Sequence, residues 1–190
     1  NEQKAFVNNE STLTGAETAY ANLKAAAEKE AADTAAVAAA VAKIEAIGKV
    51  EYTNESKAKI NAARTAYDAL TDDQKVKVTE EQFKILTDAE TAYANLEATA
   101  EKEAADQKAA NAVIALIDAI GNVEYTDESK AKIDEARAAY DVLTDDQKVK
   151  VTADKRNILT DAEAAYANLK AIAEKEAADQ KAANAVIALI

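Results

Sequence analysis

The residues most able to do chemistry in this chain are its 35 carboxylates. Two adjacent pairs stand out, Asp72-Asp73 and Asp145-Asp146. As a general acid and base, such a pair would need burial or a pocket to separate its two pKa values. Each pair instead follows a Thr at the expected start of a helix, where acidic side chains offset the helix dipole. We therefore expect that the protein is not an enzyme.

Metal binding is the other chemistry that carboxylates allow. Asp141, Asp145 and Asp146 are close enough in sequence to meet, but a calcium ion needs six or more oxygens, and no Asp-x-Asp-x-Asp-Gly loop occurs. The chain contains no His and no Cys, so zinc sites and nucleophile–base pairs of the usual kinds are excluded. We expect no catalytic, cofactor-binding or metal site and no cofactor.

The formal net charge of -12 bears on the partners. Nucleic acids and anionic lipid surfaces both require basic patches, so we expect neither as a partner. No apolar run approaches the 18 or so residues of a membrane-spanning helix, and we expect no membrane insertion. The absence of Cys also excludes disulfides but does not fix the compartment.

The strongest feature of the sequence is an internal repeat of 73 residues, which separates Gly48 from Gly121. Residues 49–117 and 122–190 differ at 14 of 69 positions, and five of these are consecutive, 80–84 against 153–157. The N-terminal copy is two residues shorter at the same place. Because surface loops tolerate substitution and length change, we expect loops at 79–85 and 152–158.

A long helix is predicted from a Thr cap at Thr87 to a Gly stop at Gly121, about 33 residues. The same stretch occurs at 13–48 and again from Leu159 to the last residue, Ile190. Between the apolar stripes of this helix lies the segment 100–111, which has no large apolar residue. We expect it to form a solvated helical bridge, sustained by the helix propensity of Ala.

Shorter helices are predicted over 54–70 and 127–143, each preceded by a Thr cap. A capping box, Thr144 to Gln147, opens a short helix after the second of them. Apolar residues recur at helical spacing in the helices, and we expect four tyrosines to lie in the cores with their hydroxyls at the rim: Tyr67, Tyr93, Tyr140 and Tyr166.

These elements predict an all-α fold made of tandem three-helix bundles, joined end to end by long shared helices as in a spectrin-like rod. The expected organisation is a C-terminal part of a preceding repeat (a loop plus a helix), two full three-helix repeats and the start of a next repeat, at 1–33, 34–106, 107–179 and 180–190.

Residues 113–151 and 159–169 resemble the tandem helical repeats of large surface proteins and secreted enzymes of Gram-positive bacteria. The resemblance rests on the AIG…YT…ESK opening, the AR-x-AY-D-x-L-T-x-x-Q-K middle and the LT-x-AE-x-AY close. It covers nearly the whole chain. It implies a stalk or spacer that projects a functional domain away from the cell wall, on the extracellular surface of the bacterium, with flanking domains of the same polypeptide as partners.

Two function classes follow for a chain expected to be monomeric. The first is the structural spacer, since near-identical units and a fixed period are what a rod requires. The alternative is a host-protein-binding module of the adhesin type, which would need an exposed apolar patch. Phe83 and its counterpart Arg156 differ between the copies, and we name them as possible partner-binding residues; the competing expectation is that Phe83 folds back and caps its own bundle.

Overall fold

The structure, a computed structural model, describes the backbone of residues 2–188 and the side chains of residues 9–188. Within that range the chain forms helices only, which confirms the predicted all-α class. They are α1 Glu2–Glu45, α2 Asn54–Asp68, α3 Asp72–Lys75, α4 Glu80–Ile120, α5 Asp127–Asp141, α6 Asp145–Lys150 and α7 Ala153–Ile187. Residue 1 of the predicted 1–33 segment and residues 189–190 of the predicted 180–190 segment lie outside the described range.

The chain divides into two compact units, Asn1–Ala98 and Thr99–Ile190, which we call unit 1 and unit 2. Helix α4 supplies residues to both units. The repeat boundaries 34–106 and 107–179 remain a prediction, because they follow the sequence period, whereas the two units follow packing.

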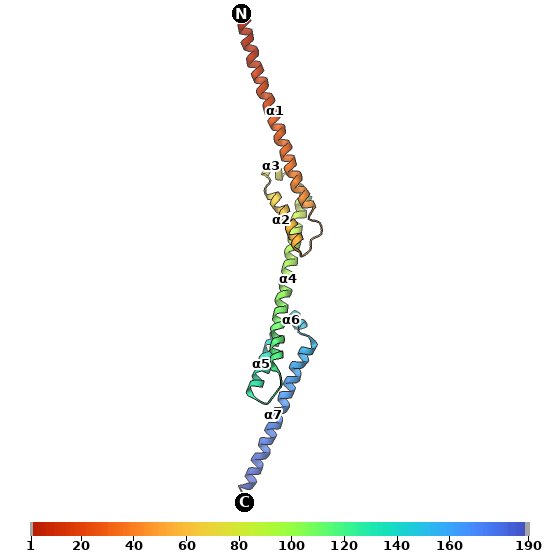
Figure 1. Cartoon of the computed structure of the whole chain (residues 1–190), viewed down its shortest axis with the longest axis vertical. Coiled ribbons are helices and arrows are strands. Elements are labelled where there is room, and N and C mark those ends of the chain that lie inside the picture. Colours follow the sequence, from red (N-terminus) through yellow and green to blue (C-terminus); the bar gives the residue numbers. More distant parts are fainter. Residues whose placement is uncertain (1, 189–190) are drawn as a thin grey trace. The chain divides into compact units, whose positions relative to one another are not determined.

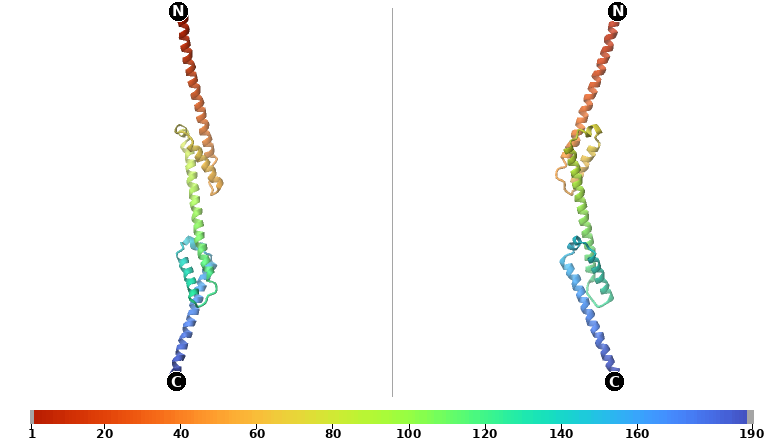
Figure 2. Two further views of the ribbon diagram at one scale, coloured as in Figure 1. Left: turned by 60° about the vertical axis from the view of Figure 1, so that its left-hand side comes forward. Right: turned by 180° about the vertical axis from the view of Figure 1, so that it is seen from behind.

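In unit 1, three helices share a core. Figures 1 and 2 show α2 beside the C-terminal part of α1 and the first part of α4. Ile44 comes from α1, Ile60 from α2 and Leu86 from α4, and all three belong to one buried cluster. A second cluster lies beside the short helix α3 and joins Ala40, Leu70 and Val78.

Unit 2 builds its core from the equivalent positions, each 73 residues further along. Ile117 of α4, Ile133 of α5 and Leu159 of α7 lie in one buried cluster. Val151, at the end of α6, is fully buried in the same cluster. Each unit is thus a small helical bundle with its own apolar core.

The starts of the shorter helices agree with the prediction from sequence, whereas α2 and α5 each end two residues earlier than predicted. The Thr53 and Thr126 hydroxyls accept the backbone N–H groups of Ser56 and Ser129 and cap α2 and α5. Complete capping boxes start α3 and α6 at Thr71 and Thr144.

Two glycines end the long helices in the predicted way. Gly48 and Gly121 have φ values of 65° and 62°, shortly after the last residues of α1 and α4. Residues with side chains rarely adopt this left-handed conformation, which glycine adopts without steric cost.

The expected surface loops at 79–85 and 152–158 are wrong, because both stretches open a long helix. Thr79 forms its own capping box: its hydroxyl accepts the Gln82 N–H at 3.2 Å, and the Gln82 side-chain oxygen accepts the Thr79 N–H at 3.0 Å. Thr152 caps α7 through the Lys155 N–H. Helix α4 therefore has 41 residues rather than about 33.

The Thr at the predicted start of the long helix is an interior residue. The Thr87 hydroxyl donates to the carbonyls of Phe83 and Lys84 in the preceding turn, and the Thr160 hydroxyl donates to that of Arg156. Helix α1 also begins before the expected residue 13. Extending a formed helix adds one hydrogen bond per residue, so the upstream cap defines the start.

The segment 100–111 is solvated only in part, which corrects the expected bridge. It is helical throughout, but Asp106 and Ala110 are buried in unit 2, and Ala110 belongs to its core. The fully exposed stretch is residues 101–105.

Within the described residues, no helix combines the length and apolarity required to cross a membrane.

Candidate functional site

Phe83, the first residue predicted to bind a partner, lies in the first turn of α4 and packs on its own unit. Its ring centroid is 4.8 Å from that of Tyr67 on α2. The Arg64 guanidinium lies 5.7 Å from the centre of the Phe83 ring and 5.6 Å from that of Tyr67. About a third of the Phe83 side chain stays exposed. Phe83 thus covers a half-buried core tyrosine.

Arg156, the second such residue, acts on the end of a helix. Its Nη1 donates to the carbonyl oxygens of Lys148 at 3.3 Å and Val151 at 3.1 Å. These carbonyls belong to the last turn and the C-cap of α6, where a cation also interacts favourably with the helix dipole. Arg156 therefore holds the C-terminal end of α6.

This contact accounts for a difference between the two units. Helix α6 has six residues, whereas its counterpart α3 has four. The two short helices have the same sequence from the capping Thr onward, so the cause lies outside them. Phe83 cannot donate to carbonyls as Arg156 does. The contacts found for both residues lie within their own units, and their role in binding a partner stays a prediction.

The acidic pairs lie where the sequence places them, in the first turns of α3 and α6. All four side chains are exposed. Asp146 takes part in a polar network, in which it accepts a hydrogen bond from Lys102 of α4 at 2.6 Å. Among the described residues no group of three or more His, Cys, Asp or Glu is arranged to hold a metal ion.

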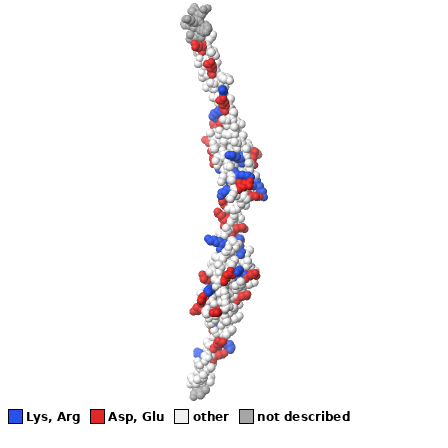
Figure 3. Space-filling model, viewed as in Figure 1, with Lys and Arg blue, Asp and Glu red and all other residues white. Residues whose placement is uncertain are grey.

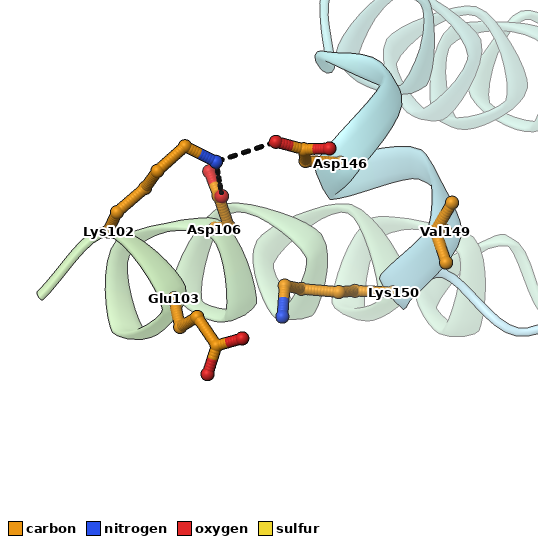
Figure 4. A pocket seen from close by; sticks show the side chains of 6 residues that line it. All are labelled: Lys102, Glu103, Asp106, Asp146, Val149 and Lys150. Atoms are coloured by element: carbon orange, nitrogen blue, oxygen red, sulfur yellow. Dashed lines mark hydrogen bonds and ion pairs between the residues drawn. The ribbon is translucent and has the colours of Figure 1, made fainter. Parts of the chain in front are cut away.

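A polar network that was not predicted from the sequence joins α6 to α4 in unit 2. Asp106 of α4 is buried and accepts hydrogen bonds from Lys102 at 2.8 Å and from the Gln147 amide at 2.9 Å. Figure 4 shows the Lys102 ammonium between Asp106 and Asp146. Unit 1 repeats the arrangement with Lys29, Asp33 and Gln74, at 2.7 and 2.8 Å.

The network shifts the acid–base equilibria of its members. The hydrogen bonds from Lys102 and Gln147 hold the pKa of Asp106 below its ordinary value, and the equivalent bonds from Lys29 and Gln74 lower that of Asp33. Hydrogen bonds to Asp106 and Asp146 raise the pKa of Lys102. Both charged forms are thus stabilised, which is the signature of a structural ion pair.

The surface around this network is a shallow depression of about 320 Å³, lined by Lys102, Glu103, Asp106, Asp146, Val149 and Lys150. The two cations and three carboxylates lie close enough to offset one another. No buried side-chain nitrogen or oxygen among the described residues lacks a hydrogen-bond partner. The buried carboxylate of the depression, that of Asp106, therefore has its hydrogen bonding satisfied within the chain.

A second contact missed from sequence joins the second and third helices of each unit. Arg64 donates through Nε and Nη2 to the two carboxylate oxygens of Glu90, both at 2.6 Å. Arg137 does the same to Glu163, at 2.6 and 2.7 Å. Both Glu residues lie inside long helices that start earlier than the sequence predicts.

Comparisons with protein-family models, with curated proteins and with solved structures found no match for the chain.

Proposed function

We propose that this chain is a structural spacer of a bacterial surface protein, a stalk of repeats that projects a functional domain away from the cell wall. The observation that carries the proposal is the equivalence of the two units. Buried core residues recur at the same positions of both, as do the Arg–Glu pair and the Lys–Asp–Gln network. Near-identical units in series are what a spacer requires, because the number of repeats then sets the length of the stalk.

Helix α4 supports the proposal through its length. It is helical from Glu80 to Ile120 and contributes Leu86 to one core and Ile117 to the other. In the spectrin-like arrangement that we propose, one such helix closes one bundle and opens the next. Each repeat would then advance the chain by about 40 Å, the difference between a 41-residue helix and a 15-residue returning helix at 1.5 Å per residue.

The surface also supports a spacer. On the face shown in Figure 3, acidic and basic side chains are intermingled over both units. The net charge of -12 would keep neighbouring stalks soluble and apart.

Chains with one, two and three repeats test the proposal. Small-angle X-ray scattering should give a maximum dimension that grows linearly, by about 40 Å for each added repeat. Growth that levels off with repeat number would show that the units fold back on one another, and the spacer function would then be wrong. Displaying a small reporter domain on one to three repeats at a cell surface should raise its height by the same increment.

A further inference from the structure

An apolar face of α1 lies open in unit 1. Leu13, Tyr20 and Leu23 have 59%, 71% and 71% of their surface exposed. They are separated by seven and three residues and so lie on one side of the helix. Figures 1 and 2 show no other helix of unit 1 beside this part of α1.

The same residues recur twice in the chain, and the counterparts of Leu13 and Tyr20 are covered both times, whereas Leu96, the counterpart of Leu23 in unit 1, keeps 37% of its surface exposed. Leu86 and Tyr93, 73 residues after Leu13 and Tyr20, are 0% and 8% exposed. They pack in the cluster that contains Ile44 from the end of α1 and Ile60 from α2. Leu159, another 73 residues along, is covered in unit 2 by the equivalent helices. In both units, the covering element is a hairpin of two helices.

We infer that residues 13–23 of α1 form a docking surface for a helical hairpin of the chain's own repeat sequence, of the kind that residues 107–143 form in unit 2. The two covered copies indicate this occupant, because the counterparts of Leu13 and Tyr20 pack under the equivalent hairpin in each unit. The inference shares the tandem arrangement with the proposed function but concerns one local surface.

A charged residue on this face matches the same occupant. Glu17 is the counterpart of Glu90 and Glu163, which each receive a two-pronged hydrogen bond from an Arg of the hairpin. Glu17 is exposed in the structure. A docked hairpin would bring the equivalent of Arg137 to this carboxylate, and such paired contacts fix the orientation of the partner.

Lys24 selects between the two hairpins that the chain contains. In unit 1 the equivalent position is Glu97, which pairs with Lys57 of the hairpin at 2.8 Å. In unit 2 it is Lys170, and the hairpin's Lys130 turns instead to Asp134 of its own helix at 2.5 Å.

The counterpart of Asp134 in unit 1 is Asn61, which offers no charge to Lys57. Lys24 also contacts Glu28 at 3.8 Å, just as Lys170 contacts Glu174 at 3.6 Å. If the unit 1 hairpin docked here, its Lys57 would lie near the positive charge of Lys24, with no carboxylate at position 61 to offset that charge. The docking surface therefore fits the unit 2 hairpin better.

Hydrogen exchange in the whole chain with added segments tests this inference. A second copy of residues 99–144 is placed directly before residue 1. Thr144 at the end of the added copy and Gln3 then recreate the Thr-x-x-Gln capping box. We expect amides of residues 13–25 to exchange at least about ten-fold more slowly than in the unextended chain, because a packed helix opens less often than an exposed one.

Two matched extensions serve as controls. The first carries Ile133→Asp in the added hairpin only, and it should give no protection because its core face is disrupted. The second adds residues 26–71, the unit 1 hairpin, and should protect residues 13–25 less than the 99–144 extension does. Amides of α2 and α5 in the original units report that the rest of the chain stays folded.

Three outcomes would overturn parts of the inference. Equal exchange at 13–25 with and without the 99–144 extension would remove the docking surface, as would equal protection by the Ile133→Asp extension. Equal protection by the two unmodified hairpins would remove the role assigned to Lys24. The scattering test of the spacer measures overall length, so either proposal can fail while the other stands.

Discussion

The side-chain amide of Gln147 donates to the buried Asp106 carboxylate at 2.9 Å, while its oxygen accepts the Thr144 backbone N–H at 3.0 Å. One residue thus caps α6 and fastens it to α4. Gln74 makes the same pair of bonds, to Asp33 and Thr71 in unit 1. Because the arrangement occurs in both units, it gives two independent places to test its contribution.

Replacing Gln147 with Ala should destabilise unit 2. The change removes a helix cap, at a cost of about 1 kcal/mol, and leaves Asp106 with one hydrogen-bond donor fewer. Thermal unfolding should shift downward by a few degrees, and the amides of α6 should lose protection. The matched control is Gln107→Ala in α4, whose exposed side-chain amide donates to Asn111 of that helix. Equal melting of the two variants would contradict the role given to Gln147.

The stability of both units should fall in acid. Asp33 and Asp106 have lowered pKa values in the folded state, so the unfolded state binds protons more readily than the folded one. Their contribution is therefore complete above the ordinary Asp pKa of 3.8 and is lost as the pH falls through the lowered folded-state values. Chemical denaturation between pH 6 and about 2 measures this loss. An Asp33→Asn, Asp106→Asn double variant should show a shallower decline, and an unchanged slope would refute the assignment.

Exchanging the two variable residues should exchange the lengths of the short helices. Arg156→Phe removes the donor to the Lys148 and Val151 carbonyls, so the last turn of α6 should fray. Phe83→Arg should lengthen α3 in the same way. Cα chemical shifts of residues 76–78 and 149–151 report the change. If α6 keeps six residues in the Arg156→Phe variant, the explanation of its length is wrong.

Two equivalent tyrosines should respond differently to truncation. Tyr93 is buried in the core of unit 1, so Tyr93→Ala should cost about 3 kcal/mol, near the lower end for a large aromatic side chain. Tyr20→Ala should change the stability of this chain by less than about 0.5 kcal/mol, since Tyr20 is exposed. Urea unfolding of the two variants compares them directly. A large effect at Tyr20 would mean that its face is already covered in solution.

The shorter helices and the core positions could be predicted from sequence because their signals are local. A Thr cap and apolar residues at helical spacing define α2 and α5, and Ile60 and Ile133 lie buried where this spacing places them. The four core tyrosines are less uniform than expected: Tyr93 is buried, whereas Tyr67, Tyr140 and Tyr166 are half-buried.

The starts of the long helices could not be predicted, because two capping signals compete. Thr79 and Thr87 each precede a Gln or Glu at the third position, and only the structure shows that the first is used. The variation at 80–84 looked like that of a loop, but it lies on a solvent-facing helical turn with Phe83 as its inward contact.

The buried network was hidden for a different reason. Asp106 and Gln147 are 41 residues apart, and each has a sufficient local interpretation, as a bridge residue and as part of a capping box. A signal existed in the repeat, since Asp33 and Gln74 have the same separation. Nothing in the local sequence, however, indicates that their helices pack together.

The proposed spacer requires α4 to hold two bundles at a fixed distance, and a spin-label distance measurement tests this requirement most directly. Labels on Cys introduced at Ala62 and Glu135, exposed and equivalent positions of α2 and α5, should give one narrow distance distribution. Ala105→Pro, in the exposed stretch of α4, should broaden or shift it while both units still melt normally, and Ala105→Ser should leave it unchanged. A broad distribution in the parent chain, or the same narrow one with Pro at this position, would contradict the account.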